Sequence, residues 1–139
     1  LKLERNEITD EGIRMLAEST ILTGVKSLNL ERNSIGDEGV RSLSLSPLFS
    51  HLTVLNLWKN LVGSEGAKAI SDSFILSNLQ RLDLAHNRIG DDGGKALAES
   101  QTLTSLKYVD LFGNGIGEET QATLKESLNF KNLQHLVLE

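Results

Sequence analysis

One short phrase recurs every 27 residues along this chain of 139 residues. The phrase reads LKLERNEI, LNLERNSI, LNLWKNLV, LDLAHNRI and VDLFGNGI, and it begins at Leu1, Leu28, Leu55, Leu82 and Val109, with a further start at Leu136. A fixed period of this length is typical of solenoids, in which one unit is too small to bury its own apolar face and must stack on its neighbours. The sequence therefore predicts a stacked array with a ribbon-like core.

The period divides the chain into a single domain of five repeats and the beginning of a sixth. The repeats cover residues 1–27, 28–54, 55–81, 82–108 and 109–135, and residues 136–139 start the sixth. The terminal repeats of a free solenoid need a polar outer face, and neither end of this sequence shows a clear cap. We therefore expect the chain to be a fragment of a longer protein.

Each repeat contains the signals of a strand, a turn and a helix. Leu1 and Leu3 alternate with polar residues, which is the pattern of a short strand with one buried side. Ile8 then returns to the core, and the acidic residues of the segment TDEG suit the first turn of a helix, where the helix dipole favours negative charge. A helix of about ten residues is too short to persist alone in water, so stacking must stabilise it.

An asparagine occupies the same position of every repeat. The five are Asn6, Asn33, Asn60, Asn87 and Asn114. An amide side chain is both a donor and an acceptor and can bond the backbone locally. Asparagine also forms turns without any wider role, but its strict recurrence favours a structural ladder of amides that bridges the loops of adjacent coils.

The dimensions of strands and helices predict a curved array. Strand–helix–strand connections between parallel strands are right-handed. Paired strands lie about 4.8 Å apart, whereas helices are about 10 Å wide, so the helical side needs more room. We predict an α/β fold, a right-handed curved solenoid with a parallel β-sheet on the concave face and α-helices on the convex face.

The pattern L-x-L-x-x-N-x-I-x-x-x-G-x-x-x-L resembles the leucine-rich repeat family, most closely its ribonuclease-inhibitor-like subclass with a helical convex side. The resemblance covers the whole chain. The repeats have no cysteine, look like cysteine-free bacterial arrays, and are loosely similar to NOD-type receptors and Ran GTPase-activating proteins. The fifth repeat departs from the pattern at Thr120, which replaces a glycine. The resemblance implies that a partner protein binds the concave sheet.

Three aromatic residues should project from that concave sheet: Trp58, Tyr108 and Phe112. Exposed aromatic side chains on a rigid surface are typical anchors for a partner. Trp58 and Phe112 share one column, and the small Ala85 between them predicts a notch that one apolar partner side chain would fill. The alternative is that these aromatic residues pack on each other and cover the sheet without a partner.

The middle column of the predicted sheet consists of Lys2, Asn29, Asn56, Asp83 and Asp110. It becomes acidic toward the C-terminus, where Asp83 and Asp110 are neighbours. Adjacent carboxylates repel each other, so a basic group of the partner would relieve the repulsion, although a solvated polar face explains them almost as well. The predicted partner-binding residues are Trp58, Phe112, Tyr108, Ala85, Asp83, Asp110, Arg81 and Asn56.

The sequence contains no pattern that predicts catalysis, a metal site or a cofactor. The three histidines lie in different repeats and there is no cysteine, so a zinc site is not expected. Ser19, Ser46, Ser73, Ser100 and Ser127 recur once per repeat, which indicates a structural role. The net charge of the chain is −5, whereas nucleic-acid binders usually carry a basic surface. The sequence has no run of about 18 apolar residues, so it predicts no membrane-spanning helix.

The hypothesis that fits best is a protein–protein interaction module without catalytic activity of its own. Two alternatives stay open. One is a regulatory segment of a GTPase-activating or NOD-like sensor protein. The other is a structural array that associates end to end, because open terminal repeats expose strand edges. The compartment is not fixed by the sequence. Cytoplasm is the default, and a bacterial protein of this kind is equally suited to delivery into a host cell.

Overall fold

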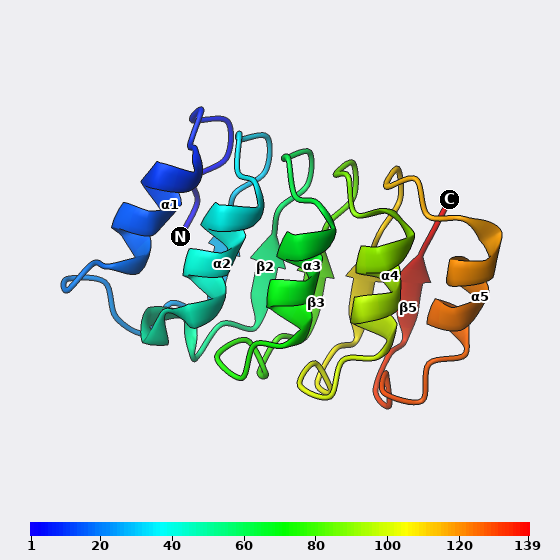
Figure 1. Cartoon of the computed structure of the whole chain (residues 1–139). Coiled ribbons are helices and arrows are strands. Elements are labelled where there is room, and N and C mark those ends of the chain that lie inside the picture. The colour runs from blue at the N-terminus through cyan, green and yellow to red at the C-terminus, as the bar shows by residue number, and fades with distance from the viewer.

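Short strands alternate with short helices along residues 1–139, all of which the computed structural model describes (Figure 1). The helices are α1 (Asp10–Ala17), α2 (Asp37–Leu45), α3 (Ser64–Ser71), α4 (Gly90–Ala98) and α5 (Glu118–Lys125), and a 3-10 turn at Pro47–Phe49 follows α2. The strands are β1 (Ser27–Asn29), β2 (Val54–Asn56), β3 (Arg81–Asp83), β4 (Tyr108–Asp110) and β5 (His135–Val137). Each helix is 8 or 9 residues long, slightly shorter than the sequence predicts.

The five strands form one parallel sheet in the order of the chain, β1-β2-β3-β4-β5. Leu28 pairs with Leu55, which pairs with Leu82, so the register of the sheet keeps the period of the sequence. At the edge of the sheet, the first repeat contributes an isolated bridge, Lys2 to Asn29, in place of a full strand. The backbone ladder nevertheless continues there, because Leu3 donates its N–H to the carbonyl of Asn29 at 2.8 Å.

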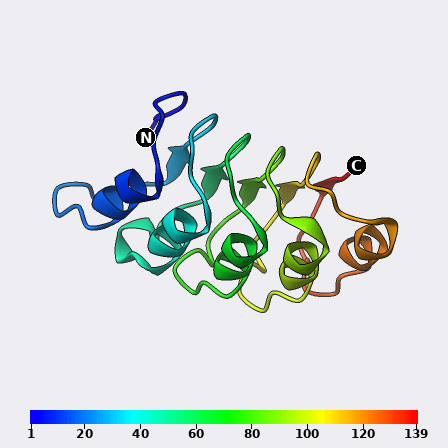
Figure 2. The same ribbon diagram turned by 45° about the horizontal axis from the view of Figure 1, so that its top comes forward.

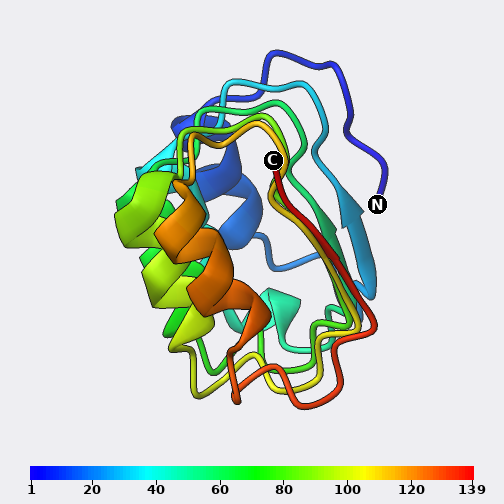
Figure 3. The same ribbon diagram turned by 90° about the vertical axis from the view of Figure 1, so that its right-hand side faces the viewer.

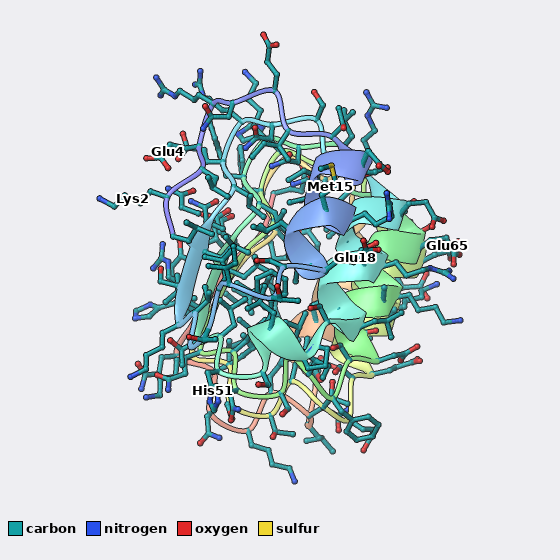
Figure 4. All side chains as sticks on the ribbon, turned by 90° about the vertical axis from the view of Figure 1, so that its left-hand side faces the viewer. Lys2, Glu4, Met15, Glu18, His51 and Glu65 are labelled. Carbon is teal, nitrogen blue, oxygen red and sulfur yellow. The ribbon has the colours of Figure 1, made fainter.

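The sheet and the helices form two separate layers. Viewed along the array, the strands lie on one side and the helices on the other (Figure 3). The helices spread along a longer arc than the strands (Figure 2). Side chains at the N-terminal end follow the same division, with Lys2 and Glu4 on the sheet side and Glu18 and Glu65 on the helix side (Figure 4). The predicted α/β solenoid is confirmed.

A continuous apolar core of 27 buried residues lies between the two layers. Strands contribute alternate leucines such as Leu28 and Leu55, and helices contribute residues such as Val40 and Leu43, all with 0% exposure. A fully buried side chain of this size contributes about 1.5–3 kcal/mol. The core therefore holds helices that would not be stable in isolation.

The recurrent asparagines bridge successive turns of the chain. The Asn60 side-chain oxygen accepts a hydrogen bond from the Ile35 N–H at 3.1 Å, and its amide donates to the Leu30 carbonyl at 2.9 Å and to the Leu57 carbonyl at 3.1 Å. Ile35 and Leu30 belong to the preceding repeat, so one side chain serves two turns. Asn6 has no preceding repeat in the structure, and its amide donates only to the Glu4 carbonyl.

The recurrent serines also join neighbouring repeats. Ser73 donates its hydroxyl to the carbonyl of Ser44, and Ser100 donates to that of Ser71, both at 2.6 Å. Ser46 makes the equivalent bond to Ala17 at 2.6 Å. Each of these hydroxyls therefore donates its hydrogen bond to a backbone carbonyl near the end of the previous helix.

The acidic residues of the first helical turn act on the next repeat as well as on their own helix. Asp37 accepts hydrogen bonds from the N–H groups of Gly63 and Gly66 at 2.7 and 2.9 Å, which satisfies free donors at the start of α3. This approach requires glycine, because a Cβ atom at Gly66 would lie 2.7 Å from the Asp37 oxygen.

Candidate functional site

Every second residue of each strand projects its side chain from the outer face of the sheet. Leu55 and Leu57 point into the core with 0% exposure, whereas the alternating Val54, Asn56 and Trp58 are half-buried on the outer face. The register aligns equivalent residues of successive repeats into columns that run across the strands. The face is therefore a fixed grid of side chains, roughly 4.8 Å apart from one strand to the next.

An aromatic row crosses this face through three repeats and consists of Trp58, His86 and Phe112, with Arg32 packed against its first ring. The Arg32 guanidinium lies 4.8 Å from the centroid of the Trp58 ring. The His86 ring lies edge-on to both its neighbours, with centroids 5.5 Å from Trp58 and 5.4 Å from Phe112. Edge-to-face contacts of this kind contribute about 0.5–1.5 kcal/mol each, so the row is an ordered surface even without a partner.

The notch expected at Ala85 is absent, and that prediction is wrong. Ala85 is only 2% exposed, and the His86 ring occupies the space between Trp58 and Phe112. The cause is the backbone at His86, whose left-handed φ of 55° breaks the alternation of the strand. Gly113 leaves room for this ring, because a Cβ atom there would lie 2.8 Å from His86 Nδ1.

His86 belongs to a set of residues that we call the turn column: Arg5, Arg32, Lys59, His86 and Gly113. Their φ angles are 59°, 54°, 54°, 55° and 70°. A left-handed backbone costs a residue with a side chain about 1–2 kcal/mol, whereas glycine adopts it freely. Four of the five repeats therefore hold a cationic or imidazole side chain in a conformation that glycine adopts at lower cost.

Tyr108 stands beside the aromatic row and packs against a cation. The Arg81 guanidinium lies 3.8 Å from the centroid of the Tyr108 ring, and the Tyr108 hydroxyl donates to an Asp110 carboxylate oxygen at 3.3 Å. Burial raises the pKa of Tyr108, the Asp110 charge raises it further, and Arg81 opposes this shift. Arg81, Tyr108 and Asp110 thus form one connected group on the outer face.

The middle column changes from amides to carboxylates without a change of shape. Asn56 accepts a hydrogen bond from the Trp58 N–H at 2.8 Å, and Asp83 accepts the equivalent bond from the Ala85 N–H at 3.1 Å. Asp110 repeats this bond with the Phe112 N–H at 3.0 Å. Only the charge distinguishes these positions, so the two aspartates add negative charge that the turn itself does not need.

Asp83 and Asp110 face each other in the register of β3 and β4. Burial is the main cause that raises the pKa of Asp83, the Ala85 N–H opposes this, and the nearby Asp110 charge raises it further. Like charges that lie opposite each other are destabilising. The pair therefore favours a cation over this part of the sheet.

Of the eight predicted partner-binding residues, the structure places seven on the outer face and buries the eighth, Ala85. His86 was not among the predicted partner-binding residues, although Gly113 at the same position of the next repeat is a signal of a left-handed turn. No group of three His, Asp or Glu side chains is arranged around a common metal position. None of the helices has the length and apolar character needed to cross a bilayer.

The comparisons with known proteins assign the fold and the family. The model of the leucine-rich repeat family matches residues 1–17, 23–44, 50–71, 76–98 and 102–119. The chain belongs to the leucine-rich repeat family. Leucine-rich repeats generally mediate protein–protein interactions, and domains of this family are typically not catalytic.

A solved leucine-rich repeat structure has the same fold. It is the ectodomain of the receptor kinase SOBIR1 from Arabidopsis thaliana, and the match has a TM-score of 0.52 and 22% sequence identity and covers 100% of this chain and 71% of that one. No curated protein matches the sequence significantly.

Proposed function

We propose that this leucine-rich repeat segment is a protein–protein interaction module that binds a partner protein on the outer face of its sheet and has no catalytic activity of its own. The observation that supports this most strongly is the aromatic row. It keeps Trp58 and Phe112 on an accessible surface, and Phe112 is 46% exposed. Large aromatic side chains in ordered positions are typical hot spots of interfaces.

The partner would contact the aromatic row and the charged groups around it. Trp58, His86 and Phe112 supply the apolar area, and Tyr108 with Arg81 extends it toward the start of the strands. Asp83, Asp110 and Asn56 supply polar contacts in the middle column. Because hydrogen bonds and ring contacts hold these side chains before a partner arrives, little conformational entropy is lost on binding.

The absence of catalysis is also part of this proposal. Asp83 and Asp110 are the one pair of neighbouring carboxylates in the predicted site, and they lie on an open sheet face and not in a closed cleft. Four of the five recurrent serines, Ser46, Ser73, Ser100 and Ser127, donate their hydroxyls to backbone carbonyls. Neither group has the partners that activate a nucleophile or a general base.

The assignment to the ribonuclease-inhibitor-like subclass is likewise a proposal. It is supported by the α-helix that every complete repeat carries on its convex side. The period of 27 residues between paired strand residues, such as Leu55 and Leu82, agrees with it.

Affinity capture with matched variants tests the proposed function. We would immobilise the wild-type chain, a sheet-face variant (Trp58→Ala with Phe112→Ala) and a helix-side control (Lys68→Ala with Lys95→Ala), and quantify retained proteins by mass spectrometry. A partner should be retained by the wild type and by the control and lost from the sheet-face variant. Retention that is equal on all three baits, or lost only from the helix-side control, would contradict the proposal.

End-to-end self-association is a second candidate, favoured by apolar side chains near both ends of the array. Ile21 is 88% exposed and Leu128 is 89% exposed. The last repeat also borders a hollow of about 230 Å³ that Phe130, Leu133 and Leu136 line in part. Light scattering over a concentration series should show a rising mass if these ends associate, and Leu128→Asp should lower it.

A further inference from the structure

The cations of the turn column are not needed to form the turn. Lys59 and Gly113 occupy the same position of two repeats, and both adopt the left-handed backbone. The asparagine that follows makes the same amide bonds in both repeats, at 3.1 Å from Asn60 to the Leu57 carbonyl and at 2.9 Å from Asn114 to the Leu111 carbonyl. Strained residues often mark functional positions, so side chains that the turn does not need point to a role in binding.

These cations are only weakly paired within the chain. Arg5 and Arg32 share the Glu31 carboxylate at 3.9 and 3.8 Å, and their side chains are 66% and 42% exposed. Lys59 forms no ion pair, and its ammonium group lies 6.0 Å from the Trp58 ring centroid. Exposed pairs at such distances contribute little energy. Arg32 and Lys59 therefore remain available to the carboxylates of a ligand.

A hollow lies between these two cations. It measures about 430 Å³ and is lined by Arg32, Asn33, Lys59, Asn60 and Leu61. Leu61 is 43% exposed there. An acidic side chain that reaches this hollow would meet two cations and an apolar wall.

The turn column and the middle column change charge in opposite senses along the array, while Glu31 lies beside the basic residues and Arg81 beside the acidic ones. The turn column loses its permanent cations after Lys59, where it continues as His86 and then Gly113. The middle column gains its carboxylates over the same two repeats, at Asp83 and Asp110. The rings of the aromatic row run through these same repeats, with Trp58 beside the basic Lys59 at one end and Phe112 beside the acidic Asp110 at the other.

We infer that the ligand of this face is an extended peptide segment of opposite charge at its two ends. Its acidic end lies over Arg32 and Lys59, its apolar middle lies on the aromatic row, and its basic end lies over Asp83 and Asp110. The inference rests on the proposed function and specifies the chemistry of the partner. From the second repeat to the fifth there are three strand spacings, about 14 Å, which four or five extended residues span.

Ligands of a single charge fit this face less well. A uniformly acidic segment, or a nucleic acid, would meet the two aspartates over one half of its length. A uniformly basic segment would meet Arg32 and Lys59. Such juxtaposed like charges reduce affinity and suppress wrong partners.

Three labelled synthetic peptides test the inference directly: the bipolar EEEGLLGKKK and the uniform EEEGLLGEEE and KKKGLLGKKK. Their affinities for the full chain are measured by fluorescence anisotropy at low and high salt. The bipolar peptide should bind about tenfold more tightly than either uniform peptide, a difference of roughly 1.4 kcal/mol, and high salt should reduce the difference. Equal affinities, or no binding of the bipolar peptide at millimolar concentration, would overturn the inference.

Two conservative variants locate the two ends of the peptide. Lys59→Gln and Asp83→Asn should each weaken the bipolar peptide about threefold or more, and each should improve the uniform peptide whose charge it no longer opposes. Lys95→Gln on α4 is the matched control and should change none of the affinities. Effects of Lys95→Gln as large as those of Lys59→Gln would reject the assigned positions.

A further variant separates this inference from the proposed function. If a uniform peptide binds as tightly as the bipolar one and Trp58→Ala with Phe112→Ala abolishes both, the face binds peptides but the bipolar chemistry is wrong. If the bipolar peptide is preferred and the double variant has no effect, the apolar contact assigned to the aromatic row is wrong, and so is this inference. Failure of the proposed function itself is read from the capture experiment, which uses no synthetic peptide.

Discussion

The side-chain oxygen of Asn60 accepts a hydrogen bond from the backbone N–H of Ile35, 25 positions earlier in the chain, at 3.1 Å. The Asn60 amide also donates to the Leu30 carbonyl at 2.9 Å. One buried side chain therefore joins two repeats and fixes the turn from which Lys59 projects. The outer face depends on this frame for its order.

Asn60→Ala should lower the free energy of unfolding by about 1–3 kcal/mol, because it leaves the buried Ile35 N–H without a partner. The Leu30 carbonyl keeps the hydrogen bond that it accepts from the Asn33 amide. Urea denaturation followed by circular dichroism measures the change. Asn6→Ala is the control and should change it by less than about 0.5 kcal/mol, as is usual for exposed positions. A similar loss in both variants would show that the ladder has no special role.

Lys59→Gly should leave the stability unchanged or raise it by up to about 1 kcal/mol, because glycine removes the left-handed strain while it also increases the entropy of the unfolded chain. Lys68→Gly, in the exposed middle of α3, should instead cost about 1 kcal/mol. Denaturant titration of both variants is the measurement. A loss above 1 kcal/mol for Lys59→Gly would mean that the lysine stabilises the turn after all.

Asp83→Asn should stabilise the protein at neutral pH and not at acidic pH. The folded-state pKa of Asp83 is raised, mainly by burial, so the folded chain holds the proton more tightly than the unfolded chain. The corresponding stability is complete below the unfolded pKa and is lost as pH rises through the folded pKa. The amide keeps the bond to the Ala85 N–H, as Asn56 does with Trp58.

We expect a gain below about 1 kcal/mol for Asp83→Asn at pH 7, the usual scale of opposed like charges in a sheet, and almost none near pH 3. Urea titrations at both pH values give the comparison. Asp92→Asn, in the exposed first turn of α4, is the matched control and should show no gain at pH 7, because the helix dipole favours a negative charge there. Our electrostatic account of the middle column fails if Asp83→Asn is equally stable or less stable than the wild type at pH 7.

His86→Ala should open the notch that the imidazole fills and expose one side of Trp58. Trp58 is the only tryptophan of the chain, so its fluorescence emission reports this region alone and should shift to longer wavelength. The lost edge-to-face contacts should cost about 1–2 kcal/mol. His51→Ala, at an exposed position in the turn before β2, should leave the emission unchanged. An unchanged spectrum in His86→Ala would show that the imidazole does not cover Trp58.

The repeat pattern was sufficient to predict the fold because the same constraint recurs in every unit. One buried strand face and one period of 27 residues fix the register, so Leu55 pairs with both Leu28 and Leu82. The subdivision into helical and strand layers follows from the hydrophobic pattern. The missing strand in the first repeat was not predictable from its alternation, which is as regular there as elsewhere.

The details of the site were less predictable, because the strand pattern gives directions only where the backbone is extended. Alternation indicated the outer face for Trp58 but failed at the left-handed turn, where it made Ala85 look accessible and did not predict that the His86 ring fills the space between Trp58 and Phe112. The hydrogen bonds that Asp37 accepts from the N–H groups of Gly63 and Gly66 were also not predicted from the sequence. They depend on how closely two helices stack, and only the recurrence of acid and glycine at those positions hints at them.

The dissociation constant of the captured partner measures the central claim most directly, by titration calorimetry with the wild type, the Trp58→Ala/Phe112→Ala variant and the Lys68→Ala/Lys95→Ala control. If the outer sheet face is the binding surface, losing two hot-spot rings at about 2 kcal/mol each weakens binding by a hundredfold or more, and the helix-side control binds like the wild type. A correctly folded Trp58→Ala/Phe112→Ala variant that binds the partner with wild-type affinity would contradict the account.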